Sequence, residues 1–534
     1  MKMVKSLLLG SAAGLVAVAG AQAADLPVKA KPVEYVKVCS IYGAGFFYIP
    51  GTDTCIKIGG WVRAEYAFQS GNSDVPANSA GGNSLNNRIN TNELGIRARW
   101  VTSLDVRTQT EYGTLRAYSR AGFQTTTTES TQGRIYTERA FIQFAGFTLG
   151  KSQSYFDFNG GAFCYGCGYM GGSSQTGAAG TLLFAYTATL GNGITATLSA
   201  EDQSMRRGGV WDASNDATNL LAIGAFPGPT TSVDSYNVTT VPEGDSAGTQ
   251  IPDIIGALRV DQAWGSAQVA GALHQVRAGY YGNNTTGAGA LVGGVNSAFL
   301  SPADAYGWAA MAGVVINIPW NKGDKFWVEG TVAQGAAGYV GLSGSQVGTV
   351  NNYSRFNGRN VAAAWALDSI FGTSAATGGA TGQQLTQYWA IAAAFEHYWT
   401  PSLRTDIFGQ YTQATFNSTA VTLFCSSQQS PVRAVSAANL AISGAGGVPN
   451  GAAALAGCDP SFNLINVGQR TIWNPAPQFD IGLEVMYSRV ETKMDPSLVA
   501  FNFAGSGGRA AGLYAPSNEN VWSGILRFQR NFWP

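Results

Sequence analysis

Arginines recur at every second position on several segments of this chain. Arg97 and Arg99, for example, alternate with apolar residues over 94–100. The same alternation places six arginines on polar faces: Arg63, Arg97, Arg99, Arg116, Arg120 and Arg139. Guanidinium groups gathered on one surface attract and orient anions, so the pattern indicates electrostatic selection of solutes. The alternative is a solvated polar face that has no function of its own.

The segment 153–180 combines many aromatic residues with a single carboxylate, Asp157. Its rings include those of Tyr155, Phe156, Phe158, Phe163 and Tyr169. An exposed loop has little reason to carry so many rings unless it packs against something. We expect this loop to fold inward and to set Asp157 across from the arginines. The alternative is a loop that packs on its neighbours at the rim.

The six cysteines form three local pairs. The pairs are Cys39 with Cys55, Cys164 with Cys167, and Cys425 with Cys458. In an exported chain an even number of cysteines at short separations predicts disulfides. The spacing Cys-x-x-Cys at 164–167 also matches a redox motif, but no thioredoxin-like pattern surrounds it. We therefore favour three structural disulfides over a redox or zinc site.

The sequence gives little support for a catalytic site or a bound cofactor. His274 and His397 are the only histidines in 534 residues, which leaves little material for a Ser-His-Asp triad or a metal centre. Glycine-rich stretches lack the Gly-Lys-Ser/Thr ending of a phosphate-binding loop. The sequence predicts neither an enzyme nor a bound cofactor.

Alternation of apolar and polar residues is the dominant pattern of the whole chain. Over 521–532 it places one set of side chains, including Trp522 and Phe528, on one face and a second set, including Arg527, on the other. About sixteen such strands are expected, near 58–68, 92–100, 106–120, 134–145, 147–152, 181–190, 194–203, 254–264, 267–277, 306–318, 325–334, 387–399, 403–416, 467–474, 479–490 and 521–532. No segment supplies a second layer to cover so much apolar surface. We expect an all-β transmembrane barrel with lipid outside and water inside.

The connections between these strands alternate between short and long. The clearest short turn is Asn192-Gly193, a strong hairpin signal. The long ones lie near 69–91, 121–133, 153–180, 204–253, 278–305, 335–386, 417–466 and 491–520. Short periplasmic turns and long external loops are typical of outer-membrane barrels. In such a barrel an arginine facing mid-membrane lipid costs about 2–4 kcal/mol, so the arginines should face the lumen.

The first residues resemble an export signal. Lys2 and Lys5 precede an apolar run, and Ala21-Gln22-Ala23 predicts cleavage after Ala23. We expect a signal peptide over 1–23, a lead-in over 24–57 and the barrel over 58–534. Charged residues make up only 12% of the chain, about half the usual share, and no basic face predicts a nucleic-acid partner.

Several segments resemble the alphaproteobacterial porins of rhizobia and brucellae. These are 24–39 (ADLPVKAKPVEYVKVC), 42–63 (YGAGFFYIPGTDTCIKIGGWVR), 107–118 (RTQTEYGTLRAY) and 138–150 (ERAFIQFAGFTLG). The resemblance covers the whole chain after the signal and is most specific in the first 150 residues. It implies a homotrimeric, sixteen-stranded barrel in outer-membrane lipid and lipopolysaccharide. It also implies passive diffusion of small hydrophilic molecules and ions, and a constriction made by the third external loop.

The alternative function is that of a structural or adhesive surface protein. Its long loops, 204–253, 335–386 and 417–466 above all, would then contact partners.

Overall fold

The computed structural model describes most of the chain after its first segment. The described residues are 38–68, 94–127, 133–158, 163–165, 176–177, 179–213, 246–281, 291–292, 295–296, 300–342, 351–374, 379–426, 432–435, 456–503 and 512–532. The predicted signal peptide and its cleavage site lie outside these ranges. Among the described residues, no helix is both long and apolar enough to cross a membrane.

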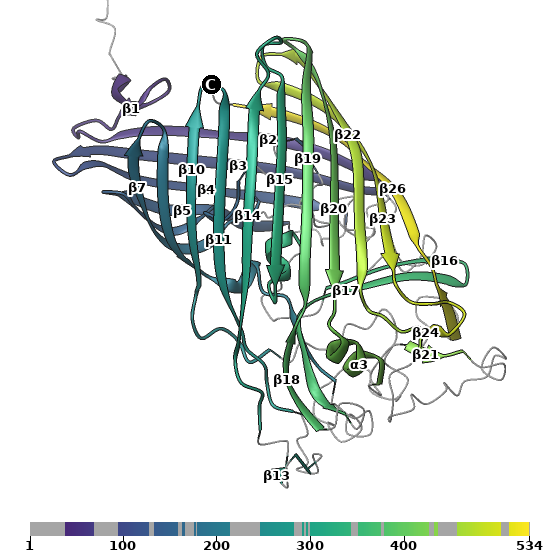
Figure 1. The fold of residues 1–534 in the computed structure, drawn as a ribbon. Helices are drawn as coiled ribbons and strands as arrows, with labels where there is room; N and C mark the ends of the chain where they lie inside the picture. Colours follow the sequence, from purple (N-terminus) through teal and green to yellow (C-terminus); the bar gives the residue numbers. More distant parts are fainter. Residues whose placement is uncertain are drawn as a thin grey trace, which may run out of the picture.

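Sixteen antiparallel strands in the described ranges form one closed barrel (Figure 1). They are β2 (Cys55–Phe68), β3 (Leu94–Thr110), β4 (Gly113–Thr126), β5 (Arg134–Phe144), β6 (Phe147–Ser152), β7 (Thr181–Gly191), β8 (Ile194–Glu201), β10 (Asp253–Gln262), β11 (Gly265–Val276), β14 (Ala305–Asn317), β15 (Lys325–Gln334), β19 (Gln387–Thr400), β20 (Leu403–Thr415), β22 (Phe462–Ala476), β23 (Phe479–Thr492) and β26 (Glu519–Asn531).

The barrel closes where its first strand meets its last. Strand β2 pairs with β3 on one side and with β26 on the other, in a register that places Trp61 opposite Asn531 and Phe68 opposite Gly524. Closure leaves no strand edge exposed, so the backbone groups of the wall are paired within the sheet. This satisfies the central requirement for a sheet in lipid.

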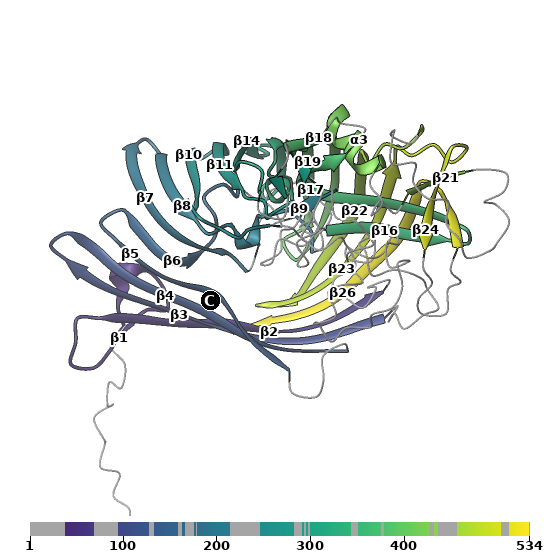
Figure 2. The same cartoon turned by 90° about the horizontal axis from the view of Figure 1, so that it is seen from below.

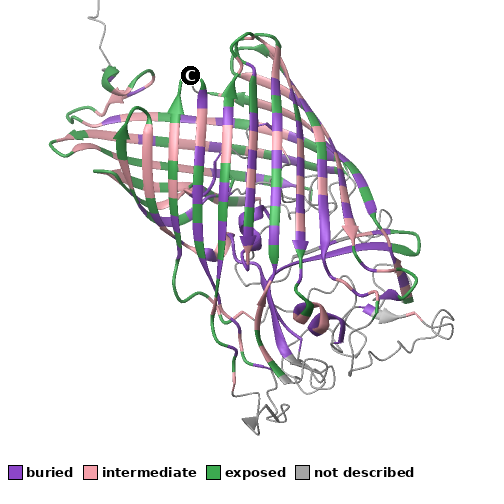
Figure 3. Cartoon of the chain, viewed as in Figure 1, coloured by how far each residue is buried: buried purple, intermediate pink, exposed green. Residues whose placement is uncertain are grey.

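Side chains on the strands alternate between a buried inner face and an exposed outer face (Figure 3). On the hairpin of β7 and β8, Phe184 and Leu198 are 58% and 63% exposed, whereas Ser199 and Glu201 are 1% and 2% exposed. The large apolar side chains therefore point outward and the polar ones inward. This inversion of the soluble pattern confirms the predicted all-β transmembrane barrel.

The strands agree closely with the sequence prediction, apart from one pair. The predicted break between residues 100 and 106 is wrong, because β3 runs without interruption to Thr110 and turns at 111–112. Ser103 and Asp105 in that stretch belong to the inner face. Asp105 among them accepts hydrogen bonds from Arg107 and Arg116.

The predicted tight turn at Asn192-Gly193 is confirmed. Both residues have positive φ, 49° and 72°, as a type I′ hairpin turn requires. A Cβ atom on Gly193 would lie 2.1 Å from the carbonyl oxygen of Asp261. Glycine is therefore needed here for both its conformation and its size.

Several long connections fold into a second structure at one end of the barrel, which we call the cap (Figures 1 and 2). Its elements are β9 (Gly209–Asp212), η7 (Ala337–Val340), β16 (Asn351–Asn357), β17 (Asn360–Ser374), β18 (Gly379–Leu385), α3 (Ser418–Ser426), β21 (Val432–Ala434), β24 (Val499–Phe503) and β25 (Gly512–Pro516). Its core packs Trp211 and Trp365 against Phe424, with ring centroids 4.8 and 5.1 Å apart. The sequence predicts loops over all of these stretches, so this part of the prediction is wrong.

Strand β17 shows why alternation of apolar and polar residues does not reveal the strands of the cap. Every residue from Val361 to Phe371 is buried, and the strand pairs with β16, β18, β9 and β25. A strand buried on both faces has no solvent-exposed side, and residues 361–367 of this strand form a continuous apolar run. Such a run cannot be recognised by a period of two.

Short elements occupy other connections: η2 (Ser40–Tyr42), β1 (Phe47–Tyr48), η5 (Gln203–Met205), β12 (Leu291–Val292) and β13 (Val295–Asn296). Strand β1 pairs with the start of β2, and the Arg107 guanidinium lies 4.9 Å from the centroid of the Phe46 ring. The lead-in thus packs at the barrel end that carries the short turns.

Two predicted disulfides are confirmed, Cys39–Cys55 in the lead-in and Cys425–Cys458 in the cap. Cys164 is buried and disulfide-bonded. Cys167 lies outside the described residues, so the Cys164–Cys167 pairing stays a prediction.

Candidate functional site

The inner face of one wall carries a dense array of charge, which we call the arginine ladder. We define it as the inward side chains of eight arginines and three carboxylates on β2 to β5 and β26: Arg63, Arg97, Arg99, Arg107, Arg116, Arg120, Arg139, Arg527, Glu65, Asp105 and Glu138. All six arginines expected from the sequence belong to it.

Glu65 joins the first strand to both of its neighbours. Its carboxylate lies 2.7 Å from Arg97 Nε, 2.6 Å from Arg527 Nη2 and 3.8 Å from Arg63 Nη1. The carboxylate is 1% exposed, so these pairs are little screened by water. Arg63 also donates two hydrogen bonds to the side-chain oxygen of Gln529.

Two further carboxylates hold the next arginines along the wall. Asp105 lies 2.8 Å from Arg107 Nη2 and 2.9 Å from Arg116 Nη2. Glu138 lies 2.7 Å from Arg120 Nε. Fixed in this way, the guanidinium groups form an ordered surface of net positive charge.

A bulge in β5 determines the position of Glu138 and Arg139. Arg120 pairs with Arg139, but the next residue, Ala121, pairs with Thr137. Glu138 is therefore the extra residue, and consecutive side chains can both point inward. Arg139 then donates hydrogen bonds to the backbone oxygens of Glu138 and Gly177.

Arg99 differs from its neighbours because it contacts no carboxylate in the described residues. Its Nε donates to the side-chain oxygen of Gln124 at 3.1 Å, and its guanidinium lies 4.9 Å from the centroid of the Tyr136 ring. This cation is held in place without being neutralised.

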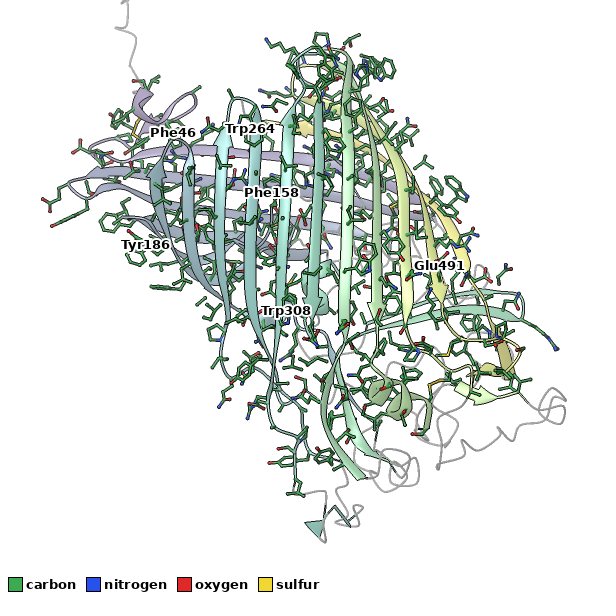
Figure 4. All side chains as sticks on the ribbon, viewed as in Figure 1. Phe46, Phe158, Tyr186, Trp264, Trp308 and Glu491 are labelled. Atoms are coloured by element: carbon green, nitrogen blue, oxygen red, sulfur yellow. A yellow bond between two sulfur atoms is a disulfide. The ribbon has the colours of Figure 1, made fainter. Side chains whose placement is uncertain are left out.

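The described parts of 153–165 leave the wall after β6 and reach strands on other sides of the lumen. Phe158 lies beneath the Arg259 guanidinium of β10, at 5.3 Å, on the stretch of wall where Figure 4 labels it. Phe163 stacks on Trp327 of β15 with centroids 5.8 Å apart. Tyr165 contacts Arg527 of β26 and Arg470 of β22.

Tyr165 is held firmly where this segment meets the far wall. The Arg527 guanidinium lies 3.4 Å from its ring centroid, and its backbone N–H donates to the carboxylate of Glu484. Burial raises the pKa of the Tyr165 phenol, although the nearby arginines oppose the change. The ring stays neutral at physiological pH and serves as a cation–π partner.

Asp157 has partners other than those expected. Its carboxylate accepts hydrogen bonds from the Thr176 backbone and hydroxyl at 2.7 and 2.6 Å, and it pairs with Arg206. Burial lowers the pKa of Arg206, but Asp157, Tyr339 and Glu201 together outweigh burial, so the pKa is raised. The Asp157 carboxylate therefore anchors the loop to the stretch after β8, and its part in permeation stays a prediction.

Carboxylates also lie on the inner faces of the later strands. Glu201, Glu329, Asp406 and Glu484 are buried there. Asp406 pairs with Arg470 at 2.9 Å. The net positive charge of the arginine ladder creates a field in the lumen, and such a field orients dipolar solutes.

A second buried cluster, which the sequence analysis missed, joins the barrel to the cap. His274 of β11 lies between two carboxylates, 2.8 Å from Asp253 Oδ1 and 3.4 Å from Asp368 Oδ2. Tyr339 donates to Asp253 at 2.6 Å. Burial raises the pKa of Tyr339 well above its usual range, and Asp253 adds to the shift, so the phenol keeps its proton.

Asp368 completes this cluster from the side of the cap. It lies on β17 and accepts hydrogen bonds from the backbone N–H groups of Gly208 and Ala337. A lone histidine on an alternating strand gives no sequence signal of such partners, because they come from segments far apart in the chain. No group of three or more metal-ligating side chains is arranged to hold a metal within the described ranges.

The chain matches the model of a protein family described as "Porin subfamily" over residues 25–525. It is 32% identical to "Porin Omp2b" of Brucella suis over 278 residues, and 32% identical to its counterpart in Brucella abortus over 284 residues. These alignments cover 49% of this chain and 64% of each relative. The alignments thus span less than two thirds of the curated relatives.

Among solved structures, the chain is similar to the outer membrane channel DcaP of Acinetobacter baumannii. The two are 12% identical with a TM-score of 0.49, and the match covers 91% of this chain and 99% of that one. It is also similar to an anion-selective porin from Comamonas acidovorans, at 10% identity and a TM-score of 0.39, covering 90% and 100%.

Proposed function

Because the chain belongs to the porin subfamily, we propose that it forms an outer-membrane channel through which small hydrophilic molecules and ions diffuse passively. The observation that supports this most is the polarity of the barrel. Its outer face carries exposed rings such as Trp100 and Trp522, whereas its inner face carries the arginine ladder. A polar lumen lets water and solutes pass without a cofactor or an energy source.

We further propose that the segment 153–180 narrows the channel opposite the arginine ladder. Phe163 and Tyr165 contact β15, β22 and β26, so they occupy space inside the lumen. Solutes would then pass between this segment and the pore-lining arginines of the ladder. Solutes would be selected by their size and by their charge at this constriction.

Three copies of the chain are proposed to associate in the membrane. The proposal comes from the family, and the exposed apolar outer face is the surface that lipid and neighbouring copies would cover.

Channel formation is tested by adding purified, folded protein to a planar lipid bilayer in potassium chloride. We expect stepwise increases in conductance, each from one inserted unit. Folding is checked on the same sample by electrophoresis before and after boiling, because an intact barrel migrates differently from the unfolded chain.

Folded protein that inserts into the bilayer and gives no conductance steps would overturn the channel proposal. That result would favour the alternative of a structural or adhesive surface protein.

A further inference from the structure

A recess lies in the lumen wall near the short-turn end, away from the arginine ladder. It encloses about 430 Å³, within the range of about 300–1,000 Å³ that small-molecule sites occupy. We define the recess by six of its lining residues: Phe158, Arg259, Lys325, Glu396, Tyr398 and Arg404. They come from β10, β15, β19, β20 and the segment that enters the lumen after β6.

Three cations and one carboxylate line this recess. Arg404 Nε lies 3.2 Å from Glu396, and Arg259 Nε lies 2.9 Å from Asp261, whose carboxylate is half exposed. Lys325 forms no ion pair with any described residue, although it lies opposite Glu396 in the strand register. One ammonium group and two guanidinium groups thus share few carboxylates.

The cations are spread over three strands, β10, β15 and β20, and Phe158 and Tyr398 lie beside two of them. The Arg259 guanidinium is 5.3 Å from the Phe158 ring centroid, and the Arg404 guanidinium is 5.7 Å from that of Tyr398. Stacking of this kind holds a guanidinium in place while its N–H groups remain available.

We propose that this recess binds small polycarboxylates on their way through the channel. Guanidinium forks match the planar geometry of a carboxylate, and Arg404 already lies in ion-pair distance of one, Glu396. Cations on three separate strands are best satisfied by a solute with two or more carboxylates. A neutral solute gains no charge pairing from them, and an ion with a single compact anionic group presents fewer groups to cations on separate strands.

This inference rests on the proposed channel and names a class of solute that the channel would hold. Binding within a pore must be strong enough to concentrate the solute and weak enough to release it. The cations of the recess attract the solute, and Glu396 competes with the solute for Arg404 and so promotes its release. Removal of the Glu396 charge should therefore tighten binding.

The test measures how citrate reduces the potassium chloride conductance of single channels when it is added to both sides. We expect Lys325→Gln to raise the half-blocking citrate concentration about fivefold, the effect of one unit charge at close range in water. Glu396→Gln should lower that concentration by a similar factor. Lys325→Arg should retain the block, because it preserves the charge.

Lys322→Gln is the matched control, because Lys322 is an exposed lysine three residues away that does not line the recess. It should leave the block unchanged, and phosphate should block more weakly than citrate. A parent channel that conducts but is insensitive to citrate would overturn the inference. So would variants at 325 and 396 that match the parent.

Failure of the channel proposal is separated from failure of this one by calorimetry. Citrate is titrated into the folded parent protein and the Lys325→Gln variant in detergent. Citrate binding that is weaker in the variant than in the parent would support the proposed binding site, even if no conductance is found. Absence of binding by the parent overturns it.

Discussion

At the scale of single residues, the ladder contains two kinds of arginine. Arg97 is paired with the buried carboxylate of Glu65, whereas the polar and aromatic partners of Arg99 among the described residues are a glutamine oxygen and a tyrosine ring. The first kind contributes mainly to structure, because its charge is compensated. The second kind presents uncompensated charge to the lumen and should dominate the selection of ions.

Arg99→Glu should therefore move the reversal potential in a salt gradient toward cations. The substitution changes the local charge by two units, and each unit is worth about 1 kcal/mol for an ion 4 Å away in water. Arg530→Glu, an equal change of charge on an exposed residue outside the ladder, is the control. A reversal potential equal to that of the parent would show that Arg99 does not contribute to ion selectivity.

His274 provides a second prediction at this scale. His274→Asn should loosen the cap, because Asp253 and Asp368 would then face each other without the ring between them. A lost hydrogen bond to a charged group costs about 1.5–3 kcal/mol, and every 1.4 kcal/mol is about tenfold in an equilibrium. Proteolysis of the cap should accelerate about 10- to 100-fold.

The chain's other histidine supplies the control for this experiment. His397 pairs with Asp324 at the short-turn end, 2.7 Å away and far from the cap. His397→Asn should leave cap proteolysis at the parent rate. Equal protection of the parent and the His274 variant would show that the buried cluster does not hold the cap.

At the scale of elements, the segment after β6 depends on its contacts at the far wall. Tyr165→Ala removes the ring that lies against Arg527 and Arg470, with cation–π contacts worth about 1–2 kcal/mol when desolvated. The segment should move away from the wall and single-channel conductance should rise. Tyr112→Ala, which alters an exposed turn ring, should leave conductance unchanged.

Conductance that stays at the parent level in Tyr165→Ala would mean that this segment does not narrow the channel. A lower conductance would mean that the freed segment blocks the lumen further.

The elements of the wall were predictable from the sequence, because lipid on one side and water on the other impose a strict period of two. Other features were not. The bulge at Glu138 breaks that period by one residue, and β17 is buried on both faces from Val361 to Phe371. The partners of Asp157 and His274 come from distant segments, so no local pattern could identify them.

At the scale of the whole molecule, the apolar outer face determines what the barrel can associate with. Exposed rings such as Trp389 and Phe184 cover it, so lipid or another apolar surface must surround it. We expect three copies to remain associated in mild detergent. The expected result in electrophoresis is one trimer-sized band without heating and one monomer-sized band after boiling. A folded, unheated band of monomer size would contradict this.

The seam between β2 and β26 has a consequence for the order in which the strands pair during folding. Arg63 and Gln529, which bond across it, are 466 residues apart in the chain. Contacts between such distant residues form late, because a long loop must close first. Until then both edges of the sheet are open to pairing with any other strand.

The charges at the seam reduce that risk. Glu65 already has Arg97 from the neighbouring strand when β2 and β3 pair, but it lacks Arg527 until the last strand arrives. A foreign strand would leave the Glu65 carboxylate and the Arg63 guanidinium without these partners. These charges therefore favour closure of the sheet on its own last strand.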